Sequence, residues 1–337
     1  MTGILEKLAD RADLTEAEAR GVMEEIMAGQ WPDARIAAFL MALRMKGETA
    51  DELVGFARVM REKARSLWED EEPLAVLDTC GTGGDRSGTF NISTAAAFVA
   101  AGAGAVVAKH GNRAASSRSG SADVFEALGV DIQMPSAKLR QALREAGIAF
   151  LFAQAFHDSM KFVMPARREL KVRTVFNILG PLASPAGAEY QVIGVWAEPL
   201  LELMASAVAR LGVRRAFVVH GQDGLDEVSV SAPTDVIEVR GGACRRFTIR
   251  PGDAGLEPSP PEALSGGDAV ENAAIIEDVL RGGGGPRRDA VLMNAGLAIA
   301  AAGLASDFVG GFRLAAQAVD SGRALGKLGQ LRVLSAS

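Results

Sequence analysis

The sequence changes character at Pro73, and this change limits the folds that the chain can adopt. From there on, short apolar runs alternate with segments that have the apolar spacing of amphipathic helices. The strand candidates are residues 74–77, 105–108, 148–153, 191–196 and 216–219, and the helix candidates are residues 94–101, 122–128, 137–146 and 200–211. Strands and helices that alternate at this spacing predict an α/β domain with a mixed, mostly parallel central sheet.

The chain after residue 228 departs from this alternation. Apolar residues alternate over residues 228–249 with Gly241 and Gly242 between them, which predicts an antiparallel excursion of the sheet. Two or three helices are then expected to close the chain, separated by the four glycines at residues 282–285.

The first seventy residues predict helices only, and therefore a small all-helical domain. Thr15 with Glu18, and again Thr49 with Glu52, have the spacing of a capping box at a helix start. A third run with helical apolar spacing lies between them, and no strand-like run interrupts the three.

A helical, basic segment at residues 160–182 interrupts the α/β alternation later in the chain. We expect this segment to cross back to the helical part and to place a basic surface on the cleft between the domains, where ligands often bind. The predicted division is a helical domain of residues 1–72, with residues 160–185 contributing, and an α/β domain formed by residues 73–159 and 186–337.

Charge and cysteine content narrow the possible partners and compartments. The chain has 36 Lys and Arg against 42 Asp and Glu, and the resulting formal charge of −6 gives no reason to expect a nucleic-acid partner. Cys80 and Cys244 cannot form a disulfide framework, and the charged N-terminus has no signal-peptide core, so a cytoplasmic protein is expected. The small-apolar stretch at residues 95–108 is too short to span a bilayer, so no membrane association is expected.

A glycine-rich loop, GTGGD at residues 81–85, follows the first strand candidate, and Asn91, Ser93 and Thr94 open the next helix candidate. Glycine lets backbone N–H groups approach an anion closely, and a helix start adds N–H groups with a favourable dipole. The spacing matches neither the dinucleotide fingerprint nor the P-loop. Such a loop taken alone is more often an ordinary β-α turn with an Asn or Ser cap.

A second polar junction strengthens the prediction of an anion site. The stretch KHGNR at residues 109–113 ends the next strand candidate, where open α/β sheets place ligand groups. Hydroxyl and cationic side chains then crowd residues 116–121 before another helix candidate. Two successive β-α junctions of this chemistry favour a phosphate site over two solvated loops.

Acidic residues follow a further strand candidate, at Asp223, Asp226 and Glu227. Such a turn taken alone is usually a solvated one. Carboxylates are, however, the ligands that Mg²⁺ takes together with water and substrate phosphates. Beside a phosphate site, these acids predict metal-assisted handling of a diphosphate.

These motifs together resemble the anthranilate phosphoribosyltransferase family of tryptophan biosynthesis. The matching stretches are DTCGTGGDRSGTFNIST, VAKHGNRAASSRSGSADVFEALGV, FLFAQAFHDSMKFVMPARRELKVRTVFNILGPLASPA and GQDGLDEVSVSAPT, and they occur in the family's order. The resemblance implies a helical domain beside an α/β domain and a homodimer packed through the helical domain. It also implies transfer of a phosphoribosyl group from phosphoribosyl diphosphate to the amine of anthranilate.

The resemblance also implies which residues contact phosphoribosyl diphosphate. Around the first loop they are Gly81, Gly84, Asp85, Thr89, Asn91, Ile92, Ser93 and Thr94. Around the second loop they are Lys109, His110, Gly111, Asn112, Arg113, Ala114, Ala115, Ser116, Ser117 and Ser121.

Two Mg²⁺ ions are implied, with Ser93, Asp226 and Glu227 as their ligands. The residues implied to touch anthranilate are Gly81, Asn112 and Arg167, and those implied to line its path are His110 and His157. A pairing shifted by one would make Arg168 the carboxylate binder, but alignment to the family pattern favours Arg167. Lys109, Asn112 and Arg167 are the expected catalytic residues.

Two other functions compete with this interpretation. A pyrimidine nucleoside phosphorylase resembles the family in fold, but the KHGN and GPLASP stretches fit it poorly. A non-catalytic, nucleic-acid-binding relative should have a basic surface and degraded motifs, whereas this chain is acidic and keeps its glycine loop. His220 is expected to be structural, and Cys80 to be a small packing residue.

Overall fold

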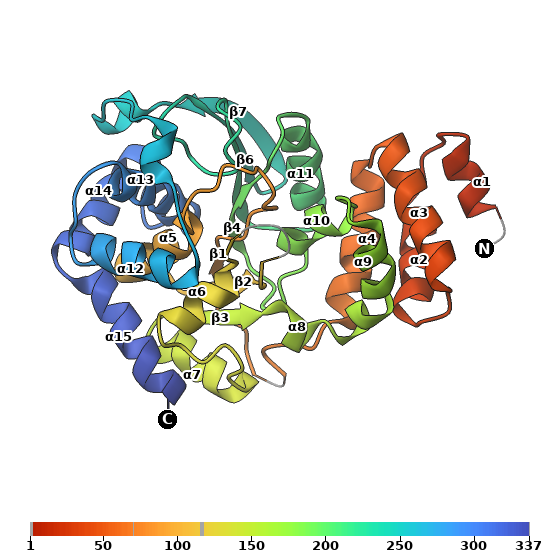
Figure 1. The fold of residues 1–337 in the computed structure, drawn as a ribbon, viewed down its shortest axis with the longest axis horizontal. Coiled ribbons are helices and arrows are strands. Elements are labelled where there is room, and N and C mark those ends of the chain that lie inside the picture. Colours follow the sequence, from red (N-terminus) through yellow and green to blue (C-terminus); the bar gives the residue numbers. More distant parts are fainter. Residues whose placement is uncertain (1–2, 70, 115–117, 337) are drawn as a thin grey trace.

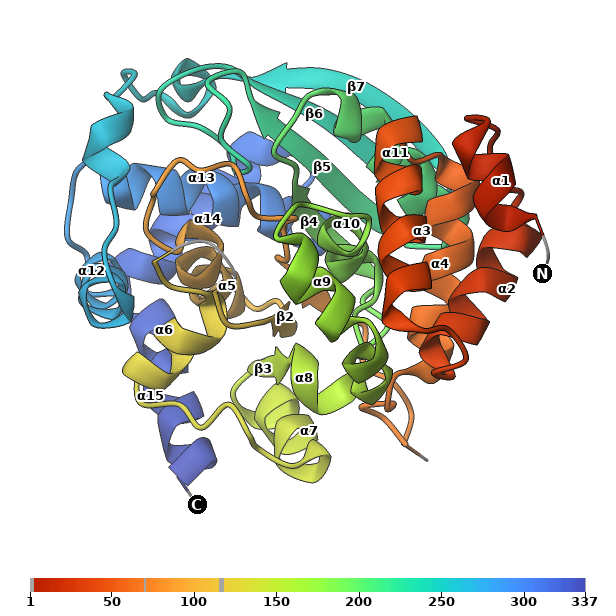
Figure 2. The same ribbon diagram turned by 45° about the vertical axis from the view of Figure 1, so that its right-hand side comes forward.

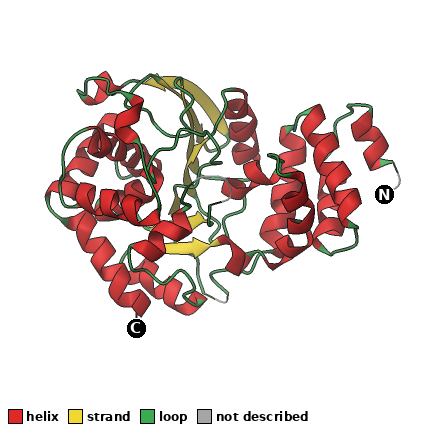
Figure 3. Cartoon of the chain, viewed as in Figure 1, coloured by secondary structure: helices red, strands yellow, loops and turns green. Residues whose placement is uncertain are grey.

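The computed structural model describes residues 3–69, 71–114 and 118–336. A helical bundle at the N-terminal end lies beside a larger body in which helices surround a twisted sheet (Figures 1 and 3). A small helical domain next to a larger α/β domain is the fold class that the sequence predicts.

The bundle contains α1 (Ile4–Ala9), α2 (Glu16–Met27), α3 (Asp33–Lys46) and α4 (Ala50–Lys63). Both predicted capping boxes are present, at Thr15 before α2 and at Thr49 before α4. The backbone of Gly47 has a φ of 91° after α3, a conformation that favours glycine and so explains the helix end there.

The seven-stranded sheet has the order β3-β2-β1-β4-β5-β6-β7. Its strands are β1 (Leu77–Asp78), β2 (Val107–Gly111), β3 (Ile148–Phe152), β4 (Tyr190–Gly194), β5 (Arg215–Gly221), β6 (Thr234–Arg240) and β7 (Ala243–Ile249). The first five strands are parallel, and β6 and β7 join antiparallel to β5 and to each other. The predicted antiparallel excursion is therefore confirmed, although it begins at residue 234 rather than at residue 228.

The two faces of the sheet pack in different hydrophobic cores, as two consecutive residues of β4 show. Val192 packs in the core of the α/β body, whereas Ile193 packs in a core that is continuous with the helical bundle. On the first face lie α5 (Ile92–Gly102) and the C-terminal helices. On the other face, α11 (Pro199–Arg210) lies between the sheet and the bundle (Figure 1).

The helices that connect β2, β3 and β4 are mostly short. They are α6 (Ser121–Ala127), α7 (Ser136–Glu145), α8 (Ala153–Phe156), η1 (Asp158–Phe162), α9 (Met164–Leu170), α10 (Phe176–Leu179) and η2 (Gly180–Leu182). The segment at residues 160–182, helical in its sequence pattern, is thus broken into short turns, because Lys171 adopts a left-handed conformation after α9. Both α9 and α10 lie on the side of the bundle that faces the sheet (Figure 2).

The chain after β7 forms η3 (Pro251–Ala254), η4 (Pro261–Leu264), α12 (Ala269–Leu280), α13 (Pro286–Ala301), α14 (Phe308–Asp320) and α15 (Arg323–Ala336). The prediction of two or three closing helices was wrong, because four follow residue 268. Residues 290–301 of α13 are all buried, so this helix has no polar face and lacks the periodicity by which helices are recognised. Within the described ranges, no helix is long and apolar enough to cross a membrane.

Candidate active site

The residues predicted to contact phosphate or metal lie at or just after the carboxyl ends of the parallel strands. The chain runs outward from β1 to β3, then returns to place β4 against the opposite edge of β1. Open α/β sheets bind ligands at such a reversal of strand order, because the two following loops diverge there and leave a crevice. The glycine loop follows β1, and Asp226 and Glu227 follow β5, which pairs with β4.

The glycine loop is held against the end of β4. Both the N–H and the hydroxyl of Thr82 donate to the carbonyl oxygen of Gly194, at 2.8 and 3.0 Å. A Cβ atom on Gly194 would lie 1.5 Å from the carbonyl oxygen of Asp226, so only glycine permits this approach. The loop itself uses left-handed conformations at Gly83 and Gly84. Loops after three different strands thus pack together at one place.

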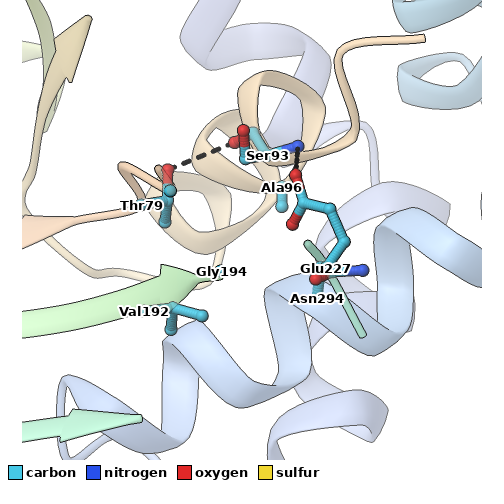
Figure 4. A pocket seen from close by; sticks show the side chains of 8 residues that line it. Thr79, Ser93, Ala96, Val192, Gly194, Glu227 and Asn294 are labelled. Atoms are coloured by element: carbon cyan, nitrogen blue, oxygen red, sulfur yellow. Dashed lines mark hydrogen bonds between the residues drawn. The ribbon is translucent and has the colours of Figure 1, made fainter. Parts of the chain in front are cut away.

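Three acidic residues lie beside this loop. The carboxylate of Asp85 lies 3.5 Å from the backbone nitrogen of Asp226, and Glu227 Oε1 accepts a hydrogen bond of 3.1 Å from the N–H of Ser93 (Figure 4). Burial raises the pKa of Asp226 well above its usual range, and the charges of Asp85 and Glu227 raise it further. Burial likewise raises the pKa of Glu227 to about 7, although Lys109 opposes that shift.

The donor set fits a magnesium ion. Buried carboxylates that repel one another are costly in the ionised form, and a bound cation would relieve that cost. Carboxylate oxygens, with the Ser93 hydroxyl at the start of α5, are the hard oxygen ligands that Mg²⁺ prefers. Asp85, which the sequence assigned to the phosphate loop, also belongs to this acidic group.

Lys109 on β2 supplies a buried positive charge to the same region. Its ammonium donates to the carbonyl oxygen of Thr79 at 2.8 Å and lies 3.4 Å from the hydroxyl of Ser93. It also lowers the pKa values of Asp78 and Glu227, against the larger effect of their burial. The buried ammonium of Lys109 thus stabilises the ionised forms of Asp78 and Glu227, at the place where the end of β1 meets the start of α5.

Asp78 gives a testable pH dependence. Its carboxylate accepts the N–H of His110 at 3.0 Å, and burial raises its pKa from 3.8 to about 7. The folded protein therefore binds this proton more tightly than the unfolded chain, and the resulting stability is lost as the pH rises from about 4 to about 7. Compared with Asp78→Asn, which does not titrate, the wild type should lose a few kcal/mol of relative stability across that window. Urea unfolding of both proteins between pH 4 and pH 8 measures the change, and a constant difference would show that Asp78 has an ordinary pKa.

Asp78, Cys80 and His110 are the one group of three His, Cys, Asp or Glu side chains in the described chain whose ligand atoms lie within 4.8 Å of one another. Burial raises the pKa of the Cys80 thiol, and Asp78 raises it further, so the thiol stays protonated. A protonated thiol is a poor metal ligand. These three side chains therefore form a packed cluster rather than a metal site, as expected for Cys80.

The second polar junction is only partly described, because the expected contacts Ala115, Ser116 and Ser117 lie outside the described residues. Lys109, His110 and Gly111 belong to β2 itself, Asn112 to Ala114 follow it, and Ser121 begins α6. The guanidinium of Arg113 pairs with Asp123 and Glu126. A Cβ atom on Gly111 would lie 2.2 Å from the Ser121 hydroxyl and 2.8 Å from the ring of Phe150, so a larger residue would displace both side chains.

The histidines expected to line the anthranilate path lie together, with ring centroids 5.4 Å apart. Burial lowers the pKa of His110 to about 3, with a further decrease from His157, and burial also lowers the pKa of His157. Both rings are therefore neutral near pH 7. His220 Nδ1 donates to the carbonyl oxygen of Val195 at 2.8 Å, which fits a structural role.

Arg167 lies on α9, where it is half-buried with its guanidinium 5.5 Å from the ring centroid of Phe176. Burial lowers its pKa. The neighbouring Arg168 is exposed to solvent. Of the two arginines, Arg167 is thus the one whose guanidinium is withdrawn from water.

Two residues that the sequence interpretation missed hold the site in place. Asn294 on α13, which lies near Glu227 (Figure 4), accepts the N–H of Val228 at 2.8 Å and donates to the carbonyl of Val228 at 2.9 Å. These bonds fix the residue after Glu227. The signal of Asn294 in the sequence is a polar residue within an apolar helical run. Arg173 donates to the carbonyl of Gly84, and so ties the segment after α9 to the glycine loop.

The chain matches two family models along most of its length. Residues 74–325 match the α/β domain of a glycosyl transferase family, and residues 2–64 match the helical bundle domain of the same family. Among curated proteins, the anthranilate phosphoribosyltransferase of Chloroflexus aggregans is 54% identical over 327 residues, which cover 96% of this chain and 95% of the relative. That of Solibacter usitatus is 51% identical over 333 residues, covering 99% and 98% of the two chains.

Solved structures resemble the whole chain. The crystal structure of anthranilate phosphoribosyltransferase from Thermus thermophilus superposes with a TM-score of 0.91 at 44% identity and covers 99% of each chain. The enzyme from Saccharomyces cerevisiae in complex with PRPP and Mg superposes with a TM-score of 0.88 at 30% identity, covering 98% of this chain and 96% of that one.

Proposed function

This chain belongs to the anthranilate phosphoribosyltransferase family, and we propose that it transfers the phosphoribosyl group of 5-phosphoribosyl 1-diphosphate to the amine of anthranilate. The products are N-(5-phosphoribosyl)anthranilate and diphosphate, and the reaction is a step of tryptophan synthesis. The observation that carries the proposal is the meeting of the glycine loop with buried acids at the strand reversal between β1 and β4. Of the functions that the sequence left open, it is the transferase that the named relatives support.

The two polar junctions would hold phosphoribosyl diphosphate. The expected contacts at the first junction lie in the loop before α5 and in its first turn, where N–H groups and the helix dipole favour an anion. Those at the second lie at the end of β2 and at the start of α6. Lys109 would offset phosphate charge, because its ammonium lies beside Thr79 and Ser93 at the first junction.

Ser93, Asp226 and Glu227 would hold Mg²⁺, and we propose two ions, with Asp85 close enough to share one of them. Bound Mg²⁺ would stabilise the negative charge that develops on the departing diphosphate. Asn294 and Gly194 would keep the acids at fixed positions, so that the site needs little rearrangement during the reaction.

Anthranilate would be positioned rather than activated. An aromatic amine is neutral at pH 7 and needs no strong base, which agrees with the neutral state of His110 and His157. Asn112 would contact the substrate at the end of β2. The guanidinium of Arg167 would grip the anthranilate carboxylate through two parallel hydrogen bonds and aim the amine at the ribose carbon.

Arg167→Ala should raise the KM for anthranilate by about 30-fold or more, because a charge-assisted, two-point contact is lost. The KM for phosphoribosyl diphosphate should stay within about twofold, since the two ligands occupy different pockets. Arg168→Ala removes the same side chain from the adjacent, exposed position and is the matched control. Initial rates over both substrate concentrations test this assignment, and equal effects on both KM values would refute it.

The activity itself is tested by the fluorescence of anthranilate, which the transfer consumes. Purified protein should reduce this signal only when phosphoribosyl diphosphate and Mg²⁺ are both present. No loss of fluorescence over a wide range of protein concentration would refute the proposed function.

We also propose the wider organisation that the sequence interpretation implied. The helical domain would comprise residues 1–72 with 160–185, which is supported by a hydrophobic core that includes residues of α1 to α4, α9 and α10. A homodimer through this domain is what the resemblance to the family implies. A cytoplasmic location is supported by two cysteines that are both free. Nucleic acid and membranes are not among the partners that we propose.

A further inference from the structure

A buried asparagine outside all of the recognised motifs joins the two phosphate junctions. Asn272 lies in the first turn of α12 and is 2% exposed. Its amide nitrogen donates to Asn91 Oδ1 at 2.9 Å and to the hydroxyl oxygen of Ser119 at 2.8 Å, and its amide oxygen accepts the N–H of Gly267 at 2.7 Å. All three bonds are of ordinary length, and together they use both hydrogens of the amide.

The partners of Asn272 come from separate parts of the chain. Asn91 precedes α5 at the first junction, and Ser119 precedes α6 at the second. The Ser119 hydroxyl also donates to Asn91 Oδ1 at 3.1 Å, which closes a triangle of three polar side chains. The bond between Asn272 and Ser119 is buried and the two bonds to Asn91 are partly buried. Their loss is costly, so the triangle fixes the two junctions relative to each other.

The segment before α12 follows the first junction closely. Phe90 donates its N–H to the carbonyl of Leu264 at 3.1 Å, and Gly266 donates its N–H to the carbonyl of Gly88 at 2.9 Å. A Cβ atom on Gly266 would lie 2.6 Å from the Cα of Phe90 and 2.8 Å from the amide oxygen of Asn272, so glycine is required at this contact. The segment that leads into the helix of Asn272 is therefore itself hydrogen-bonded to the loop before α5.

The triangle has a consequence for the start of α5. Asn91 is the N-cap residue of α5, and asparagine at this position usually accepts the N–H of the second or third residue of the helix. Here its side chain makes no such bond, because its oxygen is taken by Asn272 and Ser119. The N–H of Ser93, the second residue of α5, instead donates to Glu227.

We propose that Asn272 is a positioning residue for the phosphoribosyl diphosphate site, acting through Asn91 and Ser119. It prevents Asn91 from capping its own helix, and so leaves the N–H of Ser93 to orient Glu227. No other side chain of this size both donates two hydrogen bonds and accepts one from a single planar group, since aspartate cannot donate and glutamine is longer. The inference rests on the proposed function for the identity of the ligand only.

The test compares Asn272→Ala with Ile276→Ala, which leaves a cavity one turn further along the same helix at a fully buried position and removes no hydrogen bond. Asn272→Ala should raise the Kd for phosphoribosyl diphosphate in the presence of Mg²⁺ by about tenfold or more, measured by calorimetry. Ile276→Ala should lower the Tm but leave that Kd within about twofold. Equal Kd changes in the two variants would overturn the proposal.

A second readout does not depend on the ligand. Amide hydrogen exchange in the ligand-free protein should be faster in Asn272→Ala over residues 88–94 and 118–121, and Ile276→Ala should not accelerate these segments selectively. Unchanged exchange there would overturn the positioning role even if the protein is an active transferase. If instead the wild type does not bind phosphoribosyl diphosphate while exchange responds as expected, the proposed function fails and the structural role stands.

A milder pair of variants covers the case in which Asn272→Ala does not fold. Ser119→Ala removes one partner without a change in α12, and it should also weaken phosphoribosyl diphosphate binding. The loss of phosphoribosyl diphosphate binding free energy in the double variant Ser119→Ala/Asn91→Ala should be smaller than the sum of the losses in the two single variants, because both residues act through one triangle. Strict additivity would contradict the shared role.

Discussion

Glu227→Gln is expected to reduce kcat/KM by about 100- to 1,000-fold, the effect typical of removing a group that stabilises charge in the transition state. Glutamine keeps an oxygen that can accept the N–H of Ser93, so the local fold should persist. The change removes the charge with which this residue would hold Mg²⁺. Initial rates over a range of Mg²⁺ concentrations should therefore show a much higher metal requirement.

The same substitution should make the ligand-free protein more stable at pH 8. Burial raises the folded-state pKa of Glu227 to about 7, so at pH 8 the ionised side chain is unfavourable in the folded protein and glutamine relieves that penalty. Glu257→Gln, which removes an exposed acid, is the matched control. It should change neither the activity with its Mg²⁺ requirement nor the stability at pH 8. A Glu227→Gln protein that keeps normal activity and metal dependence would exclude Glu227 from the site.

Lys109→Met is expected to be nearly as damaging to activity, and unlike Glu227→Gln it should also destabilise the fold. The ammonium lowers the pKa values of Asp78 and Glu227, so without it both acids should be protonated over more of the neutral pH range. Breaking a buried charge pair costs about 3 to 5 kcal/mol, and protonation of the acids should bring the loss toward the lower value.

Thermal unfolding and initial rates at pH 7.5 measure the two effects of Lys109→Met. We expect a lower Tm and a loss of about 100-fold or more in kcat/KM. Lys138→Met on α7, away from the acids, should retain both properties. Wild-type stability with full activity in Lys109→Met would mean that the buried cation has no role in either the fold or the reaction.

Local patterns were enough to predict most of the elements. The two capping boxes before α2 and α4 lie where the sequence placed them, because a cap depends on residues only three positions apart. The strands of the parallel sheet were recognisable as short apolar runs, since both faces of the sheet are buried. The number of closing helices was harder to predict, because a helix that is buried all round, such as α13, lacks the periodicity that marks a helix.

The chemistry of the site could be predicted less completely than its location. The glycine loop and the acids after β5 were recognised as ligand groups, but their mutual contact joins residues 141 positions apart. The raised pKa of Asp226 comes from its burial and further from the charge of Asp85, and both depend on how Gly194 packs against the acid loop. Asn294 carries no motif, and its role depends on a contact across 66 residues of sequence.

We propose that the crevice between β1 and β4 joins two specific substrates, and the stoichiometry of the reaction tests this most directly. The protein is incubated with Mg²⁺, anthranilate and phosphoribosyl diphosphate, and diphosphate and anthranilate are quantified while the product is identified by mass spectrometry. We expect one diphosphate released for each anthranilate consumed, and a product with the mass of anthranilate plus one 5-phosphoribosyl group. Release of diphosphate without that product, or consumption of a nucleoside and phosphate in place of these substrates, would contradict the claim.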